Sequence, residues 1–210
     1  MRLVFASNNA HKLDEVRRIL PAGIEVLSLS DIGFEAEIEE TGTTLEQNSY
    51  IKASTVAAFI NGQQSVFSGQ IDGVFADDTG LEIDALGGQP GVYTARWAGE
   101  PAANRKKALA ELKGITDRGA QFRTVITLIK FSAISDQFSA ISDQYSETQV
   151  SGVVRGRIAE EEYGQGGFGY DPVFIPEGYD KTFGELPAEV KNSISHRSRA
   201  LAALVKALKD

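Results

Sequence analysis

Cysteine is absent from this 210-residue sequence, which excludes disulfide frameworks, thiolate nucleophiles and cysteine-based zinc sites. No apolar run approaches the ~18 residues of a membrane span, and the first apolar run is too short for a signal peptide. Positive charge is in deficit, with 21 Lys and Arg against 29 Asp and Glu and a formal net charge of -8. Such a chain has no general electrostatic attraction to nucleic acid or anionic membranes. We therefore expect a cytoplasmic protein with neither nucleic acid nor membrane as a partner.

The composition that remains is ordinary for a globular protein, with 42% hydrophobic and 24% charged residues. Short apolar runs predict strands at residues 3–6, 24–29, 74–76, 122–131, 150–158 and 173–175, with 81–83 as a further candidate. Helical periodicity and capping residues predict helices at residues 10–20, 44–60, 101–113 and 195–209. The strands at 122–131 and 150–158 are expected to pair antiparallel. The predicted fold class is therefore α/β, or mixed α+β, with strands of both directions in the sheet.

Two adjacent carboxylates, Asp77 and Asp78, follow the apolar run 74–76 and precede Thr79 and Gly80. We expect the strand to end here in a turn, at the sheet edge where open α/β sheets bind ligands. Neighbouring strand side chains point to opposite faces, so only one of the two carboxylates can face a given cleft. That carboxylate could bind Mg²⁺ or accept a proton from water. The structural alternative is an Asp-capped turn.

Two further segments suit phosphate and metal. Ser7, Asn8 and Asn9 lie between the first strand and the first helix, where free backbone N–H groups hold phosphates. Lys12 adds a point charge for a phosphate oxygen. Glu39, in an acidic pair before a glycine, offers a second carboxylate, and Mg²⁺ uses one or two carboxylates plus substrate phosphates. Simple helix capping and a solvated acidic loop are the structural alternatives.

The glycine-rich segment 164–172 contains two aromatic residues, Phe168 and Tyr170, that offer a stacking face for a base. A dinucleotide-binding fingerprint is excluded, because the segment leads into a strand and not into a helix. His196 and Arg197 are expected in the first turn of the last helix, where cations oppose the helix dipole and indicate an anionic or polar ligand. Carboxylates, cations and an aromatic loop together indicate a nucleoside polyphosphate site.

Residues 131–137 are repeated without a gap as residues 138–144. Two polar seven-residue units are too short for a coiled coil. The copy lies between two strands that are expected to form a hairpin. We interpret it as a duplication that lengthens the hairpin or its loop, where insertions are tolerated.

Taken together, these segments resemble the inosine triphosphate pyrophosphatase family, the non-canonical purine nucleoside triphosphate pyrophosphatases, over nearly the whole chain. The matching blocks occur in the family order. They are Ser7-Asn8-Asn9-x-x-Lys12, Glu39-Glu40-Thr41-Gly42, Ala76-Asp77-Asp78-Thr79-Gly80-Leu81, Leu86-Gly87-Gly88-x-Pro90-Gly91-Val92-Tyr93-x-Ala95-Arg96, Gly166-Gly167-Phe168-Gly169-Tyr170-Asp171-Pro172 and Lys191-x-x-Ile194-Ser195-His196-Arg197.

The resemblance implies one two-lobed domain over residues 1–210, built on a long mixed β-sheet flanked by helices, with a central cleft. It implies a homodimer that uses Mg²⁺ to hydrolyse ITP, dITP and XTP to the nucleoside monophosphate and pyrophosphate. By position, Glu39 and Asp78 match the Mg²⁺ ligands, and Asp78 also matches the proton acceptor. The positions that match substrate-binding residues are Ser7, Asn8, Asn9, Lys12, Thr79, Phe168, Gly169, Tyr170, Asp171, Lys191, His196 and Arg197.

One departure from the family pattern bears on the metal. Gln47 stands where the family commonly has Glu, and an amide does not ligate a metal as a carboxylate does, so the number of metal ions stays open. Two other functions remain as alternatives. One is a pyrophosphatase that removes modified pyrimidine triphosphates, and the other is a nucleotide-binding protein without catalysis.

Overall fold

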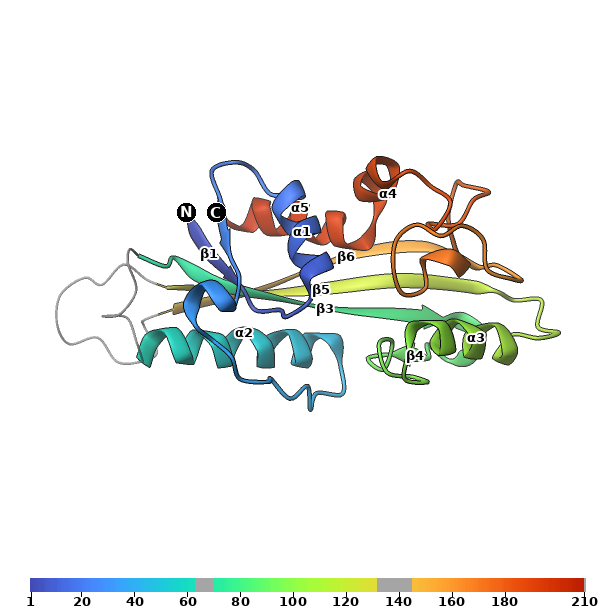
Figure 1. Cartoon of the computed structure of the whole chain (residues 1–210), viewed down its shortest axis with the longest axis horizontal. Coiled ribbons are helices and arrows are strands. Elements are labelled where there is room, and N and C mark those ends of the chain that lie inside the picture. The colour runs from blue at the N-terminus through green and yellow to red at the C-terminus, as the bar shows by residue number, and fades with distance from the viewer. Residues whose placement is uncertain (63–69, 132–144, 210) are drawn as a thin grey trace. The chain divides into compact units, whose positions relative to one another are not determined.

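The computed structural model describes residues 1–62, 70–131 and 145–209. Within these ranges it contains five α-helices and seven strands, shown in Figure 1. In chain order they are β1 (Arg2–Phe5), α1 (Ala10–Ile19), β2 (Glu25–Leu27), α2 (Leu45–Gly62), β3 (Gly73–Ile83), β4 (Pro90–Gly91), α3 (Pro101–Glu111), β5 (Gly119–Phe131), β6 (Tyr145–Ile158), β7 (Phe174–Pro176), α4 (Ala188–Ile194) and α5 (His196–Ala207). None of the described helices is long and apolar enough to cross a membrane.

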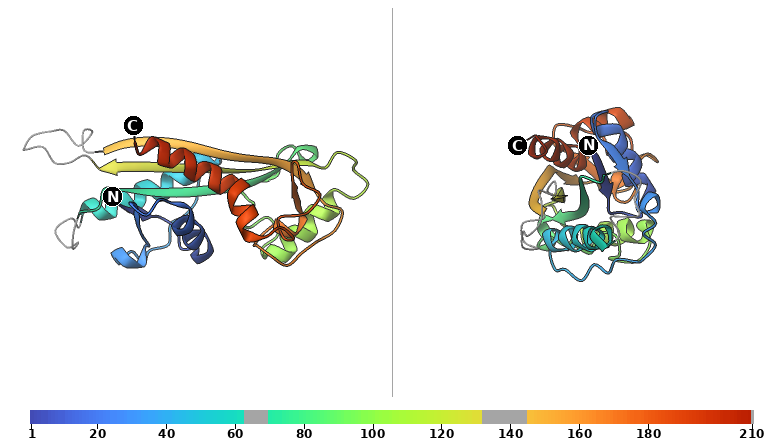
Figure 2. Two further views of the ribbon diagram at one scale, coloured as in Figure 1. Left: turned by 90° about the horizontal axis from the view of Figure 1, so that it is seen from above. Right: turned by 90° about the vertical axis from the view of Figure 1, so that its left-hand side faces the viewer.

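The strands form one mixed sheet in the order β2-β1-β3-β5-β6-β7, and β4 pairs with β3. β1 is parallel to both β2 and β3, whereas β4 is antiparallel to β3 and β7 is antiparallel to β6. β5 and β6 run in opposite directions in Figure 2, and the N–H of Ile158 at the end of β6 donates to the carbonyl of Arg118 just before β5. The predicted mixed sheet and the antiparallel pair within it are confirmed.

Two compact units divide the chain. Unit 1 comprises Met1–Asp78, Val125–Val150 and Leu201–Asp210, and unit 2 comprises Thr79–Thr124 and Ser151–Ala200. The boundaries fall inside β3, β5, β6 and α5, so these four elements contribute residues to both units. Each unit has its own hydrophobic core.

In unit 1, the side chains of β3 alternate between the two faces of the sheet, and α1 and α2 lie on opposite sides of the strands (Figure 1). Val74 and Ala76 pack into one cluster with Ala53 of α2. Phe75, between them in sequence, stacks on Phe5 of β1 with ring centroids 5.0 Å apart. This alternation places the next two residues, the aspartates, on opposite faces.

In unit 2, the second half of β3 packs against α3 and the returning strands. Leu81 and Ile83 of β3 share a buried cluster with Ala108 of α3. Phe122 of β5 meets Phe174 of β7 edge to face, with ring centroids 4.7 Å apart. Tyr170 of the glycine-rich segment belongs to the same cluster, so this segment is held against a closely packed core.

Two sequence predictions need correction. The expected turn after Asp78 is wrong, because β3 continues without a break from Gly73 to Ile83. The strand continues because residues beyond Asp78 still have partners: the Thr79 and Thr124 hydroxyls are 2.8 Å apart, and Leu81 pairs with Gly91 of β4. Helix α4 was not predicted, because a seven-residue helix shows too little periodicity. Most of the repeated segment, residues 132–144, lies outside the described residues.

Candidate active site

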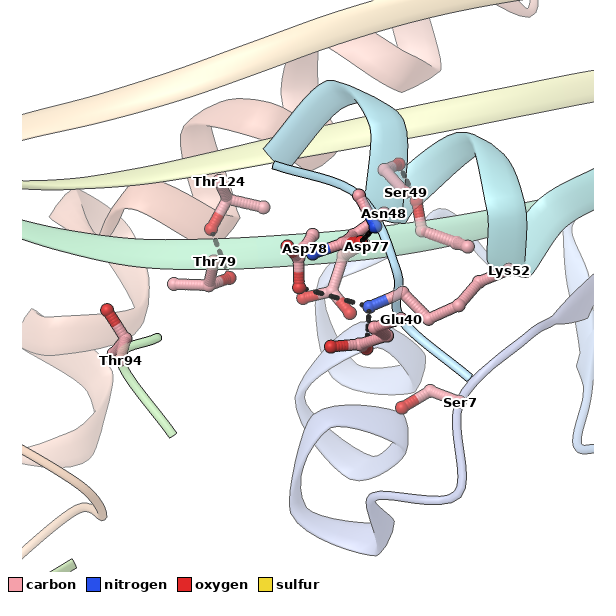
Figure 3. A network of polar contacts seen from close by, with 12 residues as sticks. Ser7, Glu40, Asn48, Ser49, Lys52, Asp77, Asp78, Thr79, Thr94 and Thr124 are labelled. Atoms are coloured by element: carbon pink, nitrogen blue, oxygen red, sulfur yellow. Dashed lines mark hydrogen bonds and ion pairs between the residues drawn. The ribbon is translucent and has the colours of Figure 1, made fainter. Parts of the chain in front are cut away.

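Two lysines pair with the adjacent aspartates in unit 1. Figure 3 shows the pairing of Asp78 with Lys52. Lys12 of α1 places its Nζ 3.0 Å from Asp77 Oδ1. Lys52 of α2 places its Nζ 3.0 Å from Asp78 Oδ1 and 2.6 Å from Glu40 Oε1. Both aspartates are buried, with 2% and 7% exposure respectively. The pairing satisfies the sequence-based rule that the two carboxylates face opposite ways.

The start of α1 provides the second part of this group. Asn9 is the N-cap, and its Oδ1 accepts a hydrogen bond of 3.1 Å from the backbone N–H of Lys12. The Ser7 hydroxyl accepts one of 3.3 Å from the N–H of Asn9, while Asn8 is exposed. The first turn of α1 has no acidic residue, so no side-chain charge in that turn repels an anion. Residues 7–9 thus lie where the sequence predicts a phosphate site, and the phosphate itself stays a prediction.

Burial and neighbouring charges shift the pKa values of the central pair. Burial raises the pKa of Asp78 and Glu40 raises it further, against the opposing effects of Lys52 and Lys12. Burial alone would lower the pKa of Lys52, but the carboxylates of Asp78, Asp77 and Glu40 outweigh it and raise that pKa. Lys52 therefore stays charged, and Asp78 is a stronger base than an ordinary aspartate.

The carboxylate oxygens in unit 1 are suitable ligands for a hard cation such as Mg²⁺. Asp78 Oδ2 is buried and has no hydrogen-bond partner in the described part of the chain, so this oxygen is open to a water molecule or a cation. Glu40 reaches the same lysine as Asp78, whereas Glu39, the predicted ligand, is exposed. No group of three or more metal-binding side chains occurs within the described ranges. One or two carboxylates suffice for Mg²⁺ when substrate phosphates complete its coordination.

The sequence did not identify Lys52 as part of this group, and of the acidic pair it favoured Glu39 over Glu40. A signal was present in α2, where the polar residues Asn48, Ser49 and Lys52 fall on the buried face beside Ala53. Polar side chains on an apolar stripe need partners, and such partners bring distant segments to α2. The Ser49 hydroxyl donates to the Ala76 carbonyl at 2.9 Å, directly before the aspartates.

In unit 2, Phe168, Asp171, Lys191 and Arg197 form one cluster. Lys191 Nζ lies 2.7 Å from Asp171 Oδ2, and both residues are buried. The Lys191 ammonium is 4.8 Å from the centroid of the Phe168 ring, and the guanidinium carbon of Arg197 is 5.6 Å from it. Asp171 Oδ2 also accepts the Phe168 N–H at 2.7 Å. The ring of Phe168 is 37% exposed and remains accessible to a flat ligand.

Tyr170 does not offer the stacking face that the sequence suggested. Its ring is only 3% exposed and belongs to the core of unit 2, and its hydroxyl donates to the Thr94 carbonyl at 3.2 Å. Burial raises the pKa of Tyr170. The preceding residue, Gly169, is held by Arg105, whose Nη1 donates to its carbonyl at 2.9 Å. Tyr170 therefore anchors the loop, and Phe168 alone supplies an exposed ring.

The start of α5 completes the unit 2 group. Ser195 caps the helix as predicted, because its Oγ accepts the N–H of Ser198 at 3.2 Å. His196 and Arg197 occupy the first turn and are buried. The His196 ring stacks on Phe122 with centroids 4.6 Å apart. Thr79, the predicted residue next to Asp78, belongs to this unit through its contact with Thr124.

Comparisons with known proteins agree over the full length. A model of the Ham1 family matches residues 3–207. The dITP/XTP pyrophosphatase of Flavobacterium johnsoniae is 44% identical, covering 99% of this chain and 98% of the relative. The dITP/XTP pyrophosphatase of Bacillus subtilis is 46% identical, covering 98% of this chain and 96% of the relative. The Ham1 protein structure from Staphylococcus aureus matches with a TM-score of 0.80 at 37% identity, covering 100% of this chain and 98% of that one. The structure of a HAM1 protein from Coxiella burnetii matches with a TM-score of 0.80 at 34% identity, covering 100% of this chain and 98% of that one.

Proposed function

The chain belongs to the Ham1 family, and from this premise we propose that it hydrolyses the non-canonical purine nucleoside triphosphates ITP, dITP and XTP. The products are the nucleoside monophosphate and pyrophosphate. The observation that carries the proposal is the 44% and 46% identity to full-length relatives named dITP/XTP pyrophosphatase. The paired lysines and carboxylates of unit 1 are the chemistry that such a reaction requires.

In the reaction, the oxygen of a water molecule forms a bond to the α-phosphorus. The bond from that phosphorus to the oxygen bridging the α and β phosphates breaks, and pyrophosphate leaves. Asp78 accepts the proton of the water, for which a raised pKa is favourable. Lys12 and the N–H groups at the start of α1 would bind phosphate oxygens.

A magnesium ion is part of the proposal. Asp78 would hold it with a carboxylate of the acidic loop, Glu39 by the resemblance or Glu40 by its position beside Lys52. When bound, Mg²⁺ neutralises phosphate charge during the displacement. Gln47 supports a single ion, because its Oε1 already accepts the N–H of Thr43 at 2.7 Å and the Thr43 hydroxyl at 3.0 Å. These contacts fix the start of α2, and position 47 supplies no carboxylate for a second ion.

The base would stack on Phe168, with Lys191 and Arg197 on the same ring. Hydrogen-bond donors suit the 6-oxo group of hypoxanthine and xanthine. Adenine presents a 6-amino donor there, and two facing donors leave both unpaired at a cost of ~1–3 kcal/mol. The cluster thus favours 6-oxo purines over ATP.

A homodimer and a cytoplasmic location complete the proposal. The resemblance supports the dimer, and light scattering on the purified chain should give twice the mass of one chain. A monomer at micromolar concentration would contradict the dimer without affecting the proposed chemistry.

The function is tested by pyrophosphate release over a panel of ITP, dITP, XTP, ATP, GTP, dUTP and modified pyrimidine triphosphates. We expect release from the first three with Mg²⁺ and loss of release when EDTA removes the ion. Faster turnover of a pyrimidine triphosphate would favour the pyrimidine alternative. Tight ITP binding measured by calorimetry, without release of pyrophosphate, would favour a nucleotide-binding protein.

A further inference from the structure

The amide of Asn48 in α2 has a fixed orientation. Its Oδ1 accepts the backbone N–H of Gly42 at 2.8 Å. A backbone N–H can only donate, so the atom facing it must be the amide oxygen and not the nitrogen. The Nδ2 donor is therefore held pointing away from Gly42.

That donor is buried without a partner. Asn48 is 0% exposed, and its Nδ2 has no hydrogen-bond partner among the residues that the structure describes. Leaving a buried donor unsatisfied is destabilising, and nearly all buried polar groups in folded proteins have a partner, so this donor calls for a function.

Asn48 lies on the same face of α2 as Lys52, because residues four apart in a helix are neighbours. Lys52 binds Asp78 Oδ1 at 3.0 Å, and in Figure 3 the Asn48 side chain points toward the two aspartates. The other Asp78 oxygen, Oδ2, is also buried and without a partner in the described ranges. Among the described residues, the Asn48 Nδ2 donor and the Asp78 Oδ2 acceptor are thus both without a hydrogen-bond partner, and they do not bond to each other.

We propose that Asn48 Nδ2 and Asp78 Oδ2 together hold the water molecule that attacks the α-phosphorus, a role that rests on the proposed hydrolysis. The water accepts a hydrogen bond from Nδ2 and donates one to Oδ2, which satisfies both atoms. Its remaining lone pair points to phosphorus. As the oxygen–phosphorus bond forms, the shared proton moves to Asp78 and pyrophosphate leaves. Asn48 is thus a water-positioning residue.

Gly42 fixes the orientation of the Asn48 amide through its backbone N–H. A Cβ at position 42 would lie 2.6 Å from Asn48 Oδ1 and 2.6 Å from Gln47 Cβ. Any side chain there would displace the amide, and its Nδ2 donor with it, without removing that donor. Gly42 thus offers a way to move the donor without removing it.

The test uses two substitutions that share only the loss of the donor. Asn48→Asp keeps an acceptor for the Gly42 N–H but adds a charge, whereas Asn48→Ala adds none. Both should lower kcat for ITP by roughly 10²-fold, the effect of misplacing a reacting group. Asn48→Ala should leave the KM for ITP, and the calorimetric affinity for a non-hydrolysable ITP analogue, within about threefold, because positioning the water does not bind phosphate.

Gly42→Ala supplies an independent arm. It should lower kcat in the wild-type background and have little further effect in Asn48→Ala, because coupled residues are non-additive. Asn61→Asp makes the same chemical change at an exposed position of α2 and should leave kcat unchanged. Circular dichroism on each variant establishes that it is folded.

Pyrophosphate release by the wild type tests the proposed function separately, since failure there would affect all variants alike. With an active wild type, a kcat within about twofold of it in both Asn48 variants would overturn the inference, given the roughly 10²-fold effect expected. A raised KM with unchanged kcat would overturn it too and assign Asn48 to phosphate binding. Additive effects of Gly42→Ala and Asn48→Ala would count against the coupling.

Discussion

At the scale of single residues, the lysine contacts of Asp77 and Asp78 distinguish the two carboxylates. Asp77 is almost completely buried and pairs with Lys12 of α1, which ties the start of α1 to the sheet. Asp78 gives one oxygen to Lys52 and keeps the other without a protein partner in the described residues. Only Asp78 therefore has an oxygen available for a proton or a cation.

Asp78→Asn should abolish turnover and leave the fold intact. An amide neither accepts the proton nor ligates the metal well, and general-base catalysis is worth about 10²–10⁴-fold. Because burial raises the pKa of Asp78, its ionised form costs the folded state stability at neutral pH, so a neutral side chain should not lower the melting temperature. Circular dichroism and the rate assay check both statements. Retention of more than about a tenth of the wild-type rate would contradict the assigned role.

The rate should also depend on pH through Asp78. The base acts when it is deprotonated, so kcat/KM should fall as the pH drops through a pKa above the ordinary value of 3.8. Lys52 lowers that pKa, so Lys52→Met should move the acid limb of the profile to higher pH. Lys206→Met, in the last turn of α5, is the matched control and should leave the limb in place. An acid limb that moves to lower pH in Lys52→Met would contradict the assignment of this limb to Asp78.

Phe168→Ala should weaken binding of every purine triphosphate by a similar factor. Stacking is worth ~1–3 kcal/mol per base and does not depend on the base edge. Dissociation constants for non-hydrolysable ITP and ATP analogues, measured by calorimetry, test this. A change confined to the ratio of ITP to ATP would mean that Phe168 reads the base edge.

At the scale of elements, the position of α5 depends on one glycine of β6. A Cβ on Gly152 would overlap the carbonyl oxygen of His196 and the backbone nitrogen of Ala200. The helix backbone therefore packs directly on the strand, and this packing places His196 and Arg197.

Gly152→Ala should force α5 away from β6. Overpacking of this kind costs about 1–3 kcal/mol, so the melting temperature should fall and the KM for ITP should rise. Gly23→Ala is the control, because a Cβ at position 23 would meet nothing within 4 Å. Equal melting temperatures for the two variants would mean that the helix adapts at no cost.

The sequence predicted most of the elements but not how polar residues pair across them. Runs such as that of β5 and the cap at Asn9 were recognisable, because period and capping are local properties. The continuation of β3 through Asp77–Gly80 was not, because Asp, Thr and Gly favour turns and the partners that hold them extended are distant in sequence. Lys52 was missed, and Glu39 was preferred to Glu40, for the same reason, since the contact of Lys52 with Glu40 depends on the tertiary fold.

The repeated segment gives a prediction about an element boundary. Phe131 ends β5 and Tyr145 begins β6, so residues 132–144 stand between these strands in the sequence. Deleting residues 138–144 about halves that stretch, and a twofold change in the length between two fixed ends changes the closure entropy by only about 0.6 kcal/mol. The deletion variant should keep a near-normal melting temperature and turnover. A large loss of either would show that the repeat contacts the folded protein.

At the scale of the whole molecule, net charge and substrate charge have the same sign. A chain with a net charge of -8 repels a triphosphate at long range. Binding must then rely on local cations such as Lys12, Lys191 and Arg197, together with a metal ion. Raising the ionic strength screens the repulsion, so association should be less salt-sensitive than for a basic nucleotide-binding protein.

The division into two units has a consequence for the gene as well as for the fold. The chain passes from one unit to the other four times, after Asp78, Thr124, Val150 and Ala200, each time within a strand or helix. Neither unit corresponds to a continuous stretch of coding sequence. No truncation, fusion or recombination at a single point can therefore transfer one half without the other, and the two halves of this enzyme must be inherited and varied together.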